Sequence, residues 1–159
     1  MLPVALLFPL PVMALSVDLA PHYMLVLRFF REKNPDTEIG SPGRFQGFNT
    51  GVVLFDLDRM RASDKYNRHA LNRDGAVEKL AGKFEFRSHL GDQCLFSLLG
   101  LEHPELFKIL PCGYNYQLDT SMFRRPFLDV FWDYHNCTDV PMIYHGNGGS
   151  HIPEEDEPM

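Results

Sequence analysis

The sequence predicts an α/β domain, because short β-rich runs alternate with stretches of helical periodicity along one chain. Runs rich in β-branched and aromatic residues, typical of strands, lie at 48–55, 107–110 and 140–144. Helical patterns cover 21–33, 59–66, 75–83, 91–99 and 127–134. A chain of 159 residues is the size of one such domain. This alternation favours sheet and helices packed in layers.

The amino-acid composition excludes several classes of protein and of partner. With 45% hydrophobic, 23% charged and 13% aromatic residues, the chain is typical of globular domains and unlike disordered, collagen-like or coiled-coil proteins. Fifteen basic and 21 acidic residues leave a net charge of −6, so nucleic acid is excluded as an expected partner. The 3 cysteines form no CxxC motif, so a metal would be held by His and carboxylate groups.

Residues 1–16 carry no charge, and two interpretations of them stay open. A membrane-spanning helix needs roughly 20 apolar residues, and Pro3, Pro9 and Pro11 would interrupt it. A signal peptide is the first interpretation, although the basic start typical of one is absent. The second, which we favour, is a buried strand or loop followed by a turn that leads into Pro21.

The remaining elements follow in order. Apolar residues at helical spacing predict a surface helix over 21–33, and Pro35 ends it. Residues 34–46 predict a loop, and 48–55 a buried strand. Asp58 is expected to cap a helix over 59–66. We expect one partial domain over 1–153 and an acidic tail over 154–159.

Three groups of residues are candidates for chemistry. Asp56 and Asp58 form a DxD pattern that would place two carboxylates on one side of a strand. They also lie where a strand gives way to a helix, and we favour a loop carboxylate and a helix cap over a metal site.

The second and third groups lie at element ends. Asp92 and Gln93 start a helix, where they serve either as a routine cap or as a pair that holds sugar hydroxyls. His145 ends a strand and is followed by glycines, which let a ligand approach the backbone. It is either a metal ligand or a structural histidine.

Together, these segments resemble the family 8 retaining glycosyltransferases. The resemblance is carried, in order, by FNTGVVL at 48–54, MR at 60–61, HLGDQ at 89–93, HPELF at 103–107, LPC at 110–112 with Asn115, and IYHGN at 143–147. Within the family, FREKNPDT at 30–37 and YHGN at 144–147 are most similar to the xylosyltransferases. The resemblance covers roughly 18–153.

The resemblance implies a partial GT-A-like fold, namely a mixed sheet with flanking helices that corresponds to the C-terminal half of the catalytic domain. Family members carry a membrane anchor and a nucleotide-binding half with the metal-binding DxD before this region. Asp56 and Asp58 match positions where the family has structural residues. Cys94 replaces the Asp that often follows GDQ.

The family also implies the site. His145 would be the third protein ligand of a Mn²⁺ ion bound to the UDP diphosphate. Asp92 and Gln93 would be the catalytic pair beside the donor sugar. The remaining donor-binding residues implied are Asn49, Gly51, Gly146 and Asn147.

Two functions are therefore expected. The first is a UDP-xylose-dependent xylosyltransferase that extends O-linked xylose-glucose glycans on EGF repeats in the endoplasmic reticulum, membrane-bound or lumenal, with a second copy of the chain as a candidate partner. We expect the 159-residue chain alone to be inactive. The second is a noncatalytic module that binds glycans or EGF repeats.

The oxidising compartment implied by the family predicts how the cysteines are used. We expect a disulfide between Cys112 and Cys137, and a free Cys94 buried in an apolar helix. Asn136 begins a glycosylation sequon, Asn-Cys-Thr, which we expect to stay unmodified because its cysteine is paired.

Overall fold

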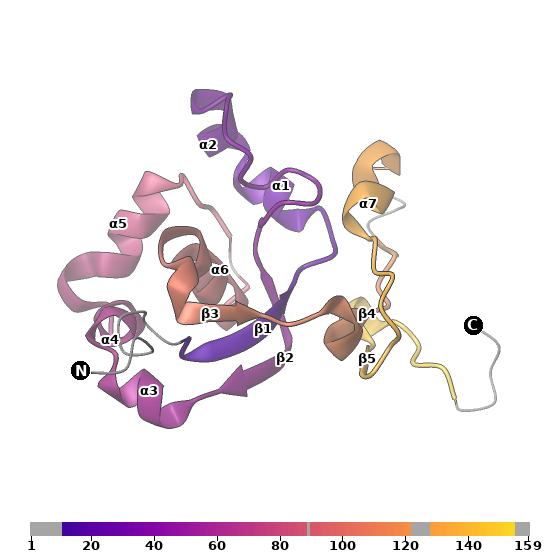
Figure 1. Ribbon diagram of the computed structural model, residues 1–159. Helices are drawn as coiled ribbons and strands as arrows, with labels where there is room; N and C mark the ends of the chain where they lie inside the picture. Colours follow the sequence, from indigo (N-terminus) through magenta and orange to yellow (C-terminus); the bar gives the residue numbers. More distant parts are fainter. Residues whose placement is uncertain (1–10, 89, 122–127, 155–159) are drawn as a thin grey trace, which may run out of the picture.

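A computed structural model describes residues 11–88, 90–121 and 128–154, and Figure 1 shows sheets flanked by helices. The main sheet has the order β2-β1-β3. β2 (Phe48–Phe55) runs antiparallel to the central β1 (Met13–Val17), and β3 (Phe107–Ile109) runs parallel to it. A second, parallel pair is formed by β4 (Tyr116–Gln117) and β5 (Tyr144–His145). The expected α/β class with a mixed sheet is confirmed.

β2 contains a bulge of three residues opposite the end of β1. Leu15 pairs with Val53, but the next residue, Ser16, pairs with Asn49. Residues 50–52 therefore have no partner in β1. A bulge removes backbone groups from the ladder and bends its strand, so these N–H groups are left for other acceptors.

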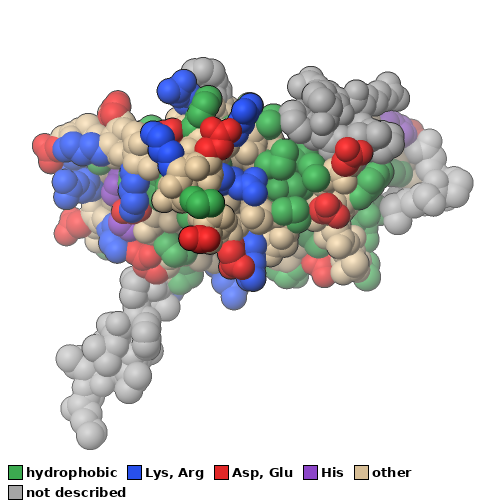
Figure 2. All heavy atoms as spheres, turned by 90° about the horizontal axis from the view of Figure 1, so that it is seen from above, with side chains coloured by type: hydrophobic (Ala, Val, Ile, Leu, Met, Phe, Trp, Pro, Cys, Tyr) green, Lys and Arg blue, Asp and Glu red, His purple; other side chains and the backbone are tan. Residues whose placement is uncertain are grey.

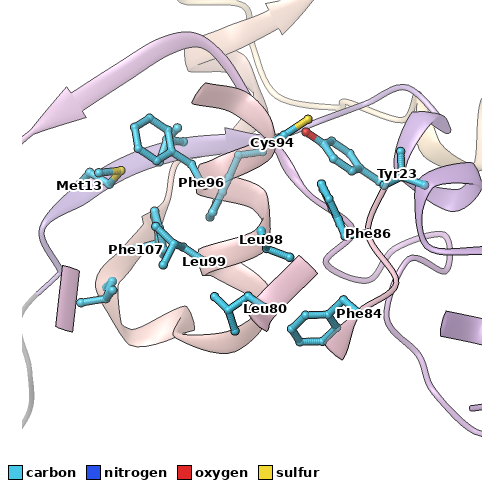
Figure 3. Close-up of a cluster of buried hydrophobic side chains, with 14 of the residues drawn as sticks. Met13, Tyr23, Leu80, Phe84, Phe86, Cys94, Phe96, Leu98, Leu99 and Phe107 are labelled. Atoms are coloured by element: carbon cyan, nitrogen blue, oxygen red, sulfur yellow. The ribbon is translucent and has the colours of Figure 1, made fainter. Parts of the chain in front are cut away.

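The core lies between the sheet and the helices α1 (His22–Val26), α5 (Ala76–Lys83) and α6 (Asp92–Glu102). α6 contacts β2, and α5 contacts α6. The sequence of α6 is apolar on most sides of the helix, as expected of a helix enclosed by other elements. Figure 3 shows ten labelled members of the core: Met13, Tyr23, Leu80, Phe84, Phe86, Cys94, Phe96, Leu98, Leu99 and Phe107.

The predicted cap at Asp58 is wrong. The helix begins earlier than expected, as α3 (Leu57–Ala62), and the Asp56 carboxylate caps it by accepting a hydrogen bond from the Arg59 amide at 3.0 Å. Asp58 lies in the first turn, where its exposed carboxylate pairs with Arg61. The helix then breaks at Ser63, which caps α4 (Asp64–Ala70).

Other predicted elements are corrected in detail. The helix over 21–33 is two short helices, α1 and α2 (Arg28–Lys33), with the buried Leu27 between them. The buried strand over 48–55 is buried only at its start, because β2 is an edge strand of its sheet, and Leu54 and Phe55 are exposed.

In place of a strand over 140–144, only 144–145 pair, with β4. Ladders of two residues are too short to show an alternating pattern.

The helices expected near 75–83 and 91–99 are confirmed as α5 and α6, and the aromatic helix as α7 (Leu128–Tyr134). Short 3-10 helices connect several elements: Arg73–Gly75, Pro104–Leu106, Cys112–Asn115 and Asn147–Gly149. Residues 1–10, His89, Phe127 and most of the acidic tail lie outside the described residues, so the expectations for them stay predictions.

The cysteine assignments are confirmed. Cys112 and Cys137 form a disulfide with their Cα atoms 5.8 Å apart, and Cys94 is free and buried. The bond ties the segment after β3 to the segment after α7, beside the small sheet on the right of Figure 1.

Surface charges of both signs are interspersed on the face shown in Figure 2. Among the described residues, ion pairs join several charged side chains, such as Lys33 with Glu85 and Lys83 with Glu102. Within the described ranges, none of the helices has the length and apolar character needed to span a bilayer.

Candidate active site around His145

The bulge in β2 is the scaffold of the candidate site. Its freed amides are taken by side chains rather than by β1. The Thr50 amide donates to Oε1 of Gln93 at 3.3 Å, and the Gly51 amide donates to Oδ1 of Asn49 at 3.0 Å. The bulge therefore brings the start of α6 and the first half of β2 into one polar cluster.

His145 lies directly against this bulge. A Cβ atom at Gly51 would lie 2.1 Å from Cε1 and 2.2 Å from Nδ1 of His145, so only glycine fits there. Nδ1 is buried and has no hydrogen-bond partner among the described residues. Burial lowers the pKa of His145, so its imidazole is neutral near neutral pH, the form that binds metal ions.

Asn49 is held by a second asparagine. Asn115 is fully buried, and its Nδ2 donates to Oδ1 of Asn49 at 3.0 Å. Oδ1 of Asn49 therefore accepts two hydrogen bonds, one of them from Gly51, which leaves its Nδ2 as the group that can donate to a ligand.

Gln93 is held at both ends of its carboxamide. Nε2 donates to Oδ2 of Asp18 at 3.1 Å, while Oε1 accepts from Thr50. Asp18 is only 6% exposed and follows β1 directly. Burial raises its pKa to about 7, and the nearby Asp119 carboxylate adds to the rise, although hydrogen bonds from Ala20 and Gln93 oppose it.

Asn147 and Gly146, two of the residues predicted to bind the donor, contact other parts of the chain. Oδ1 of Asn147 accepts from the amides of Leu118 and Asp119, at 3.0 and 2.8 Å, and so joins the loop after β5 to the end of β4. Gly146 is also tightly enclosed, because a Cβ atom there would lie 2.6 Å from the Ser150 carbonyl oxygen.

The predicted residues thus divide into groups. Four of them converge on the bulge, namely Asn49, Gly51, Gln93 and His145. Gly146 and Asn147 follow His145 in the chain, and Asp92 is exposed beside Gln93 in the first turn of α6. Asp56 and Asp58 lie beyond the opposite end of β2, where both make ion pairs with arginines.

Sequence reasoning missed three buried polar residues next to the site. Gln46 donates to the Asp18 and Ala20 carbonyls, and Gln117 bridges Leu19 and Val17. Asp18 is the third. The signal that could have found it is a lone carboxylate placed directly after an apolar strand, where the sequence predicts only a turn.

His145 is the predicted metal ligand at this site. Among the described residues, the single group of three or more potential ligands is Cys112, Cys137 and Asp139, and its cysteines are paired in the disulfide. At the bulge, His145 contributes a neutral imidazole whose Nδ1 has no hydrogen-bond partner among the described residues, and imidazole is a ligand that divalent metals accept.

Comparison with known proteins identifies relatives, although no family model matches the chain. Over 149 residues, it is 40% identical to human xyloside xylosyltransferase 1 and 41% identical to the mouse protein of that name. These matches cover 92% of this chain but only 37% and 38% of the relatives, so the chain spans well under half of their length.

A solved structure gives the same result. The crystal structure of mouse xyloside xylosyltransferase 1 in its apo form superimposes with a TM-score of 0.85 at 40% sequence identity. The match covers 92% of this chain and 50% of that one. The expected fold is therefore confirmed as part of that catalytic domain.

Proposed function

Because the chain is a homologue of the xyloside xylosyltransferases over nearly its whole length, we propose that it forms the acceptor-side half of a glycosyltransferase that uses UDP-xylose. The observation that carries this proposal is the convergence of His145, Asn49 and Gln93 on the bulge of β2. These residue types are suited to a metal-bound diphosphate and a sugar, and the homologous enzymes carry transferase names.

We propose His145 as one ligand of a Mn²⁺ ion. Its neutral imidazole and the unpartnered Nδ1 support this role. A single imidazole is a weak site, and no group of three or more potential ligands among the described residues includes His145, so further ligands would come from the diphosphate and from other parts of an enzyme. When bound, the metal neutralises charge on the departing diphosphate.

Carboxamides would hold the donor sugar. Gln93 uses one N–H on Asp18 and one lone pair on Thr50, so one position on each atom remains for sugar hydroxyls. Asn49 offers its Nδ2 in the same way. Asp92, exposed at the start of α6, would complete this side of the site and hold a hydroxyl with its carboxylate.

The remaining predicted residues would position the diphosphate. Gly146 and Asn147 shape the loop that follows His145, and the two bonds to Oδ1 of Asn147 keep this loop beside β4. Gly51 would act by making room for the imidazole. The acceptor that we propose is an O-linked xylose-glucose glycan on EGF repeats in the endoplasmic reticulum. The disulfide is compatible with that oxidising compartment.

A chimera tests this function. The matching segment of the mouse enzyme is replaced by this chain, and transfer from radiolabelled UDP-xylose to a xylose-glucose EGF glycopeptide is measured with Mn²⁺. We expect transfer by the chimera, and its loss in the His145→Ala variant. Asp58→Ala is the matched control, because its side chain is exposed and lies beyond the far end of β2.

The second candidate, a noncatalytic module, is favoured because no group of three or more potential metal ligands among the described residues includes His145. A folded chimera that binds the glycopeptide without transferring xylose would establish it. A chimera that neither binds nor transfers would contradict both functions.

A further inference from the structure

Asp18 and Gln93 form a buried pair across 75 positions of sequence. Asp18 uses both carboxylate oxygens: Oδ1 accepts from the Ala20 amide at 2.9 Å, and Oδ2 accepts from Nε2 of Gln93 at 3.1 Å. The carboxylate is therefore held by its own turn at one oxygen and faces the candidate site with the other.

We propose that Asp18 is the positioning residue of this site, and that it fixes the Gln93 carboxamide with Nε2 toward Asp18 and Oε1 toward the bulge at Thr50. The orientation of the carboxamide does not depend on the proposed function, whereas the identity of the ligand that the carboxamide binds rests on it.

The contacts at the two ends of the carboxamide allow one orientation. Thr50 presents a backbone N–H, which requires an acceptor, and the Asp18 carboxylate presents a lone pair, which requires a donor. A reversed carboxamide would place Nε2 against the Thr50 N–H and Oε1 against the carboxylate. Both contacts would then be repulsive, and both lie in a part-buried setting where unpaired polar groups are unfavourable.

The constraint depends on the charge of Asp18. A protonated carboxyl can donate to Oε1 as well as accept from Nε2, so protonation removes the preference for one orientation at that end. Burial brings the pKa of Asp18 to about 7, so both forms are accessible near neutral pH.

Other titratable groups surround the pair. Asp119, after β4, raises the pKa of Asp18 by its charge. Tyr23, on α1, donates to the Gln93 carbonyl and has a raised pKa because it is buried. His135, after α7, interacts with the Leu19 backbone and has a pKa lowered by burial. Of these groups, Asp119 carries a negative charge that acts on Asp18, so the experiment has to distinguish a titration of Asp18 from one of Asp119.

Orientation decides which groups a ligand meets. With the carboxamide as observed, a ligand finds the second N–H on the side of Asp18 and the second lone pair on the side of the bulge. Oε1 of Gln93 is bonded to Thr50, the neighbour in sequence of Gly51, against which the candidate metal ligand His145 lies.

Nuclear magnetic resonance of the ¹⁵N-labelled chain tests the inference without requiring turnover. The Gln93 side-chain amide signals, assigned with the Gln93→Glu variant, are followed from about pH 5 to about pH 9. We expect a shift with a midpoint near the pKa of about 7 given for Asp18. The shift should vanish in Asp18→Asn and persist in Asp58→Asn and Asp119→Asn. If Asp18→Asn does not fold, the Asp18 carboxyl carbon signal of the unmodified chain must show the same midpoint.

A flat Gln93 signal, or a titration that survives in Asp18→Asn, would overturn the inference. Binding of UDP-xylose with Mn²⁺ is then measured by titration calorimetry on the chimera described above and on its Asp18→Asn variant. We expect binding by the chimera that is about tenfold weaker in Asp18→Asn, the loss expected from one hydrogen bond. If the titration of the labelled chain is as expected but the chimera binds no UDP-xylose, the orienting role of Asp18 stands and the proposed function fails.

Discussion

Gly51 and His145 are in direct contact, although 94 positions of sequence separate them: a Cβ atom at Gly51 would lie 2.1 Å from Cε1 of the imidazole. The contact joins the bulge of the main sheet to the small sheet of β4 and β5. The position of the candidate metal ligand therefore depends on a residue without a side chain.

Replacing Gly51 with alanine should displace the imidazole and lower the free energy of unfolding by about 1–3 kcal/mol, the usual effect of overpacking. Urea denaturation measures this. Gly82→Ala is the matched control, because no atom lies within 4 Å of its added Cβ in α5 and alanine favours helix by about 1 kcal/mol. Equal stabilities of the two variants would contradict the close packing at Gly51.

The two carboxylates of the DxD pattern should differ in their effect on stability. Asp56→Ala removes the cap of α3 and should lower the free energy of unfolding by about 1 kcal/mol. Asp58→Ala removes only an exposed ion pair and should change it by less than about 0.5 kcal/mol. Thermal denaturation of both variants in parallel checks the assignment, which fails if Asp58→Ala is the more damaging change.

The buried Asp18 should make stability depend on pH. Its pKa is raised from 3.8 to about 7, so the folded chain holds this proton more tightly than the unfolded chain. Its stabilising contribution is present below about pH 4 and is lost as the pH rises through about 7, by about 1.4 kcal/mol for each unit of pKa difference.

The difference in unfolding free energy between the unmodified chain and Asp18→Asn isolates this effect. The pKa values of His135 and His145 are lowered by burial, so these residues destabilise the fold as the pH falls. Their contribution is common to both chains and cancels. A difference that does not change with pH would contradict a raised pKa at Asp18.

The disulfide should contribute strongly to stability. It closes a loop of 25 positions, for which the chain-entropy model gives about 3–4 kcal/mol. We expect Cys112→Ser/Cys137→Ser to unfold at correspondingly lower urea concentration. Cys94→Ala, the control, removes a buried thiol outside the bond. Peptide mapping without reduction identifies the bonded pair, and a crosslink to Cys94 would refute the assignment.

The 159-residue chain by itself should show no measurable transfer from UDP-xylose, because no group of three or more potential metal ligands among its described residues includes His145. We expect weak Mn²⁺ binding that His145→Ala weakens further and that Asp58→Ala leaves unchanged. Titration calorimetry measures the affinities, and a radiolabel assay measures transfer. Turnover by the isolated chain would contradict the expected inactivity.

Local pattern determined the elements whose signals are strong over short distances. The β-branched run of β2 and the apolar stretch of α6 were recognisable because periodicity and bounding glycines act within a few residues. The ordered motifs also indicated the family, and the pairing of Cys112 with Cys137 followed from the compartment that the family implies.

Tertiary packing decided the geometry of the site. The hydrogen bond between Asp18 and Gln93 spans 75 positions and that between Asn115 and Asn49 spans 66, and no local pattern encodes which buried group meets which partner. Likewise, the cap moved from Asp58 to Asp56 because pairing with β1 sets where β2 ends. Burial of polar groups requires partners, and only the folded chain determines which partners are within reach.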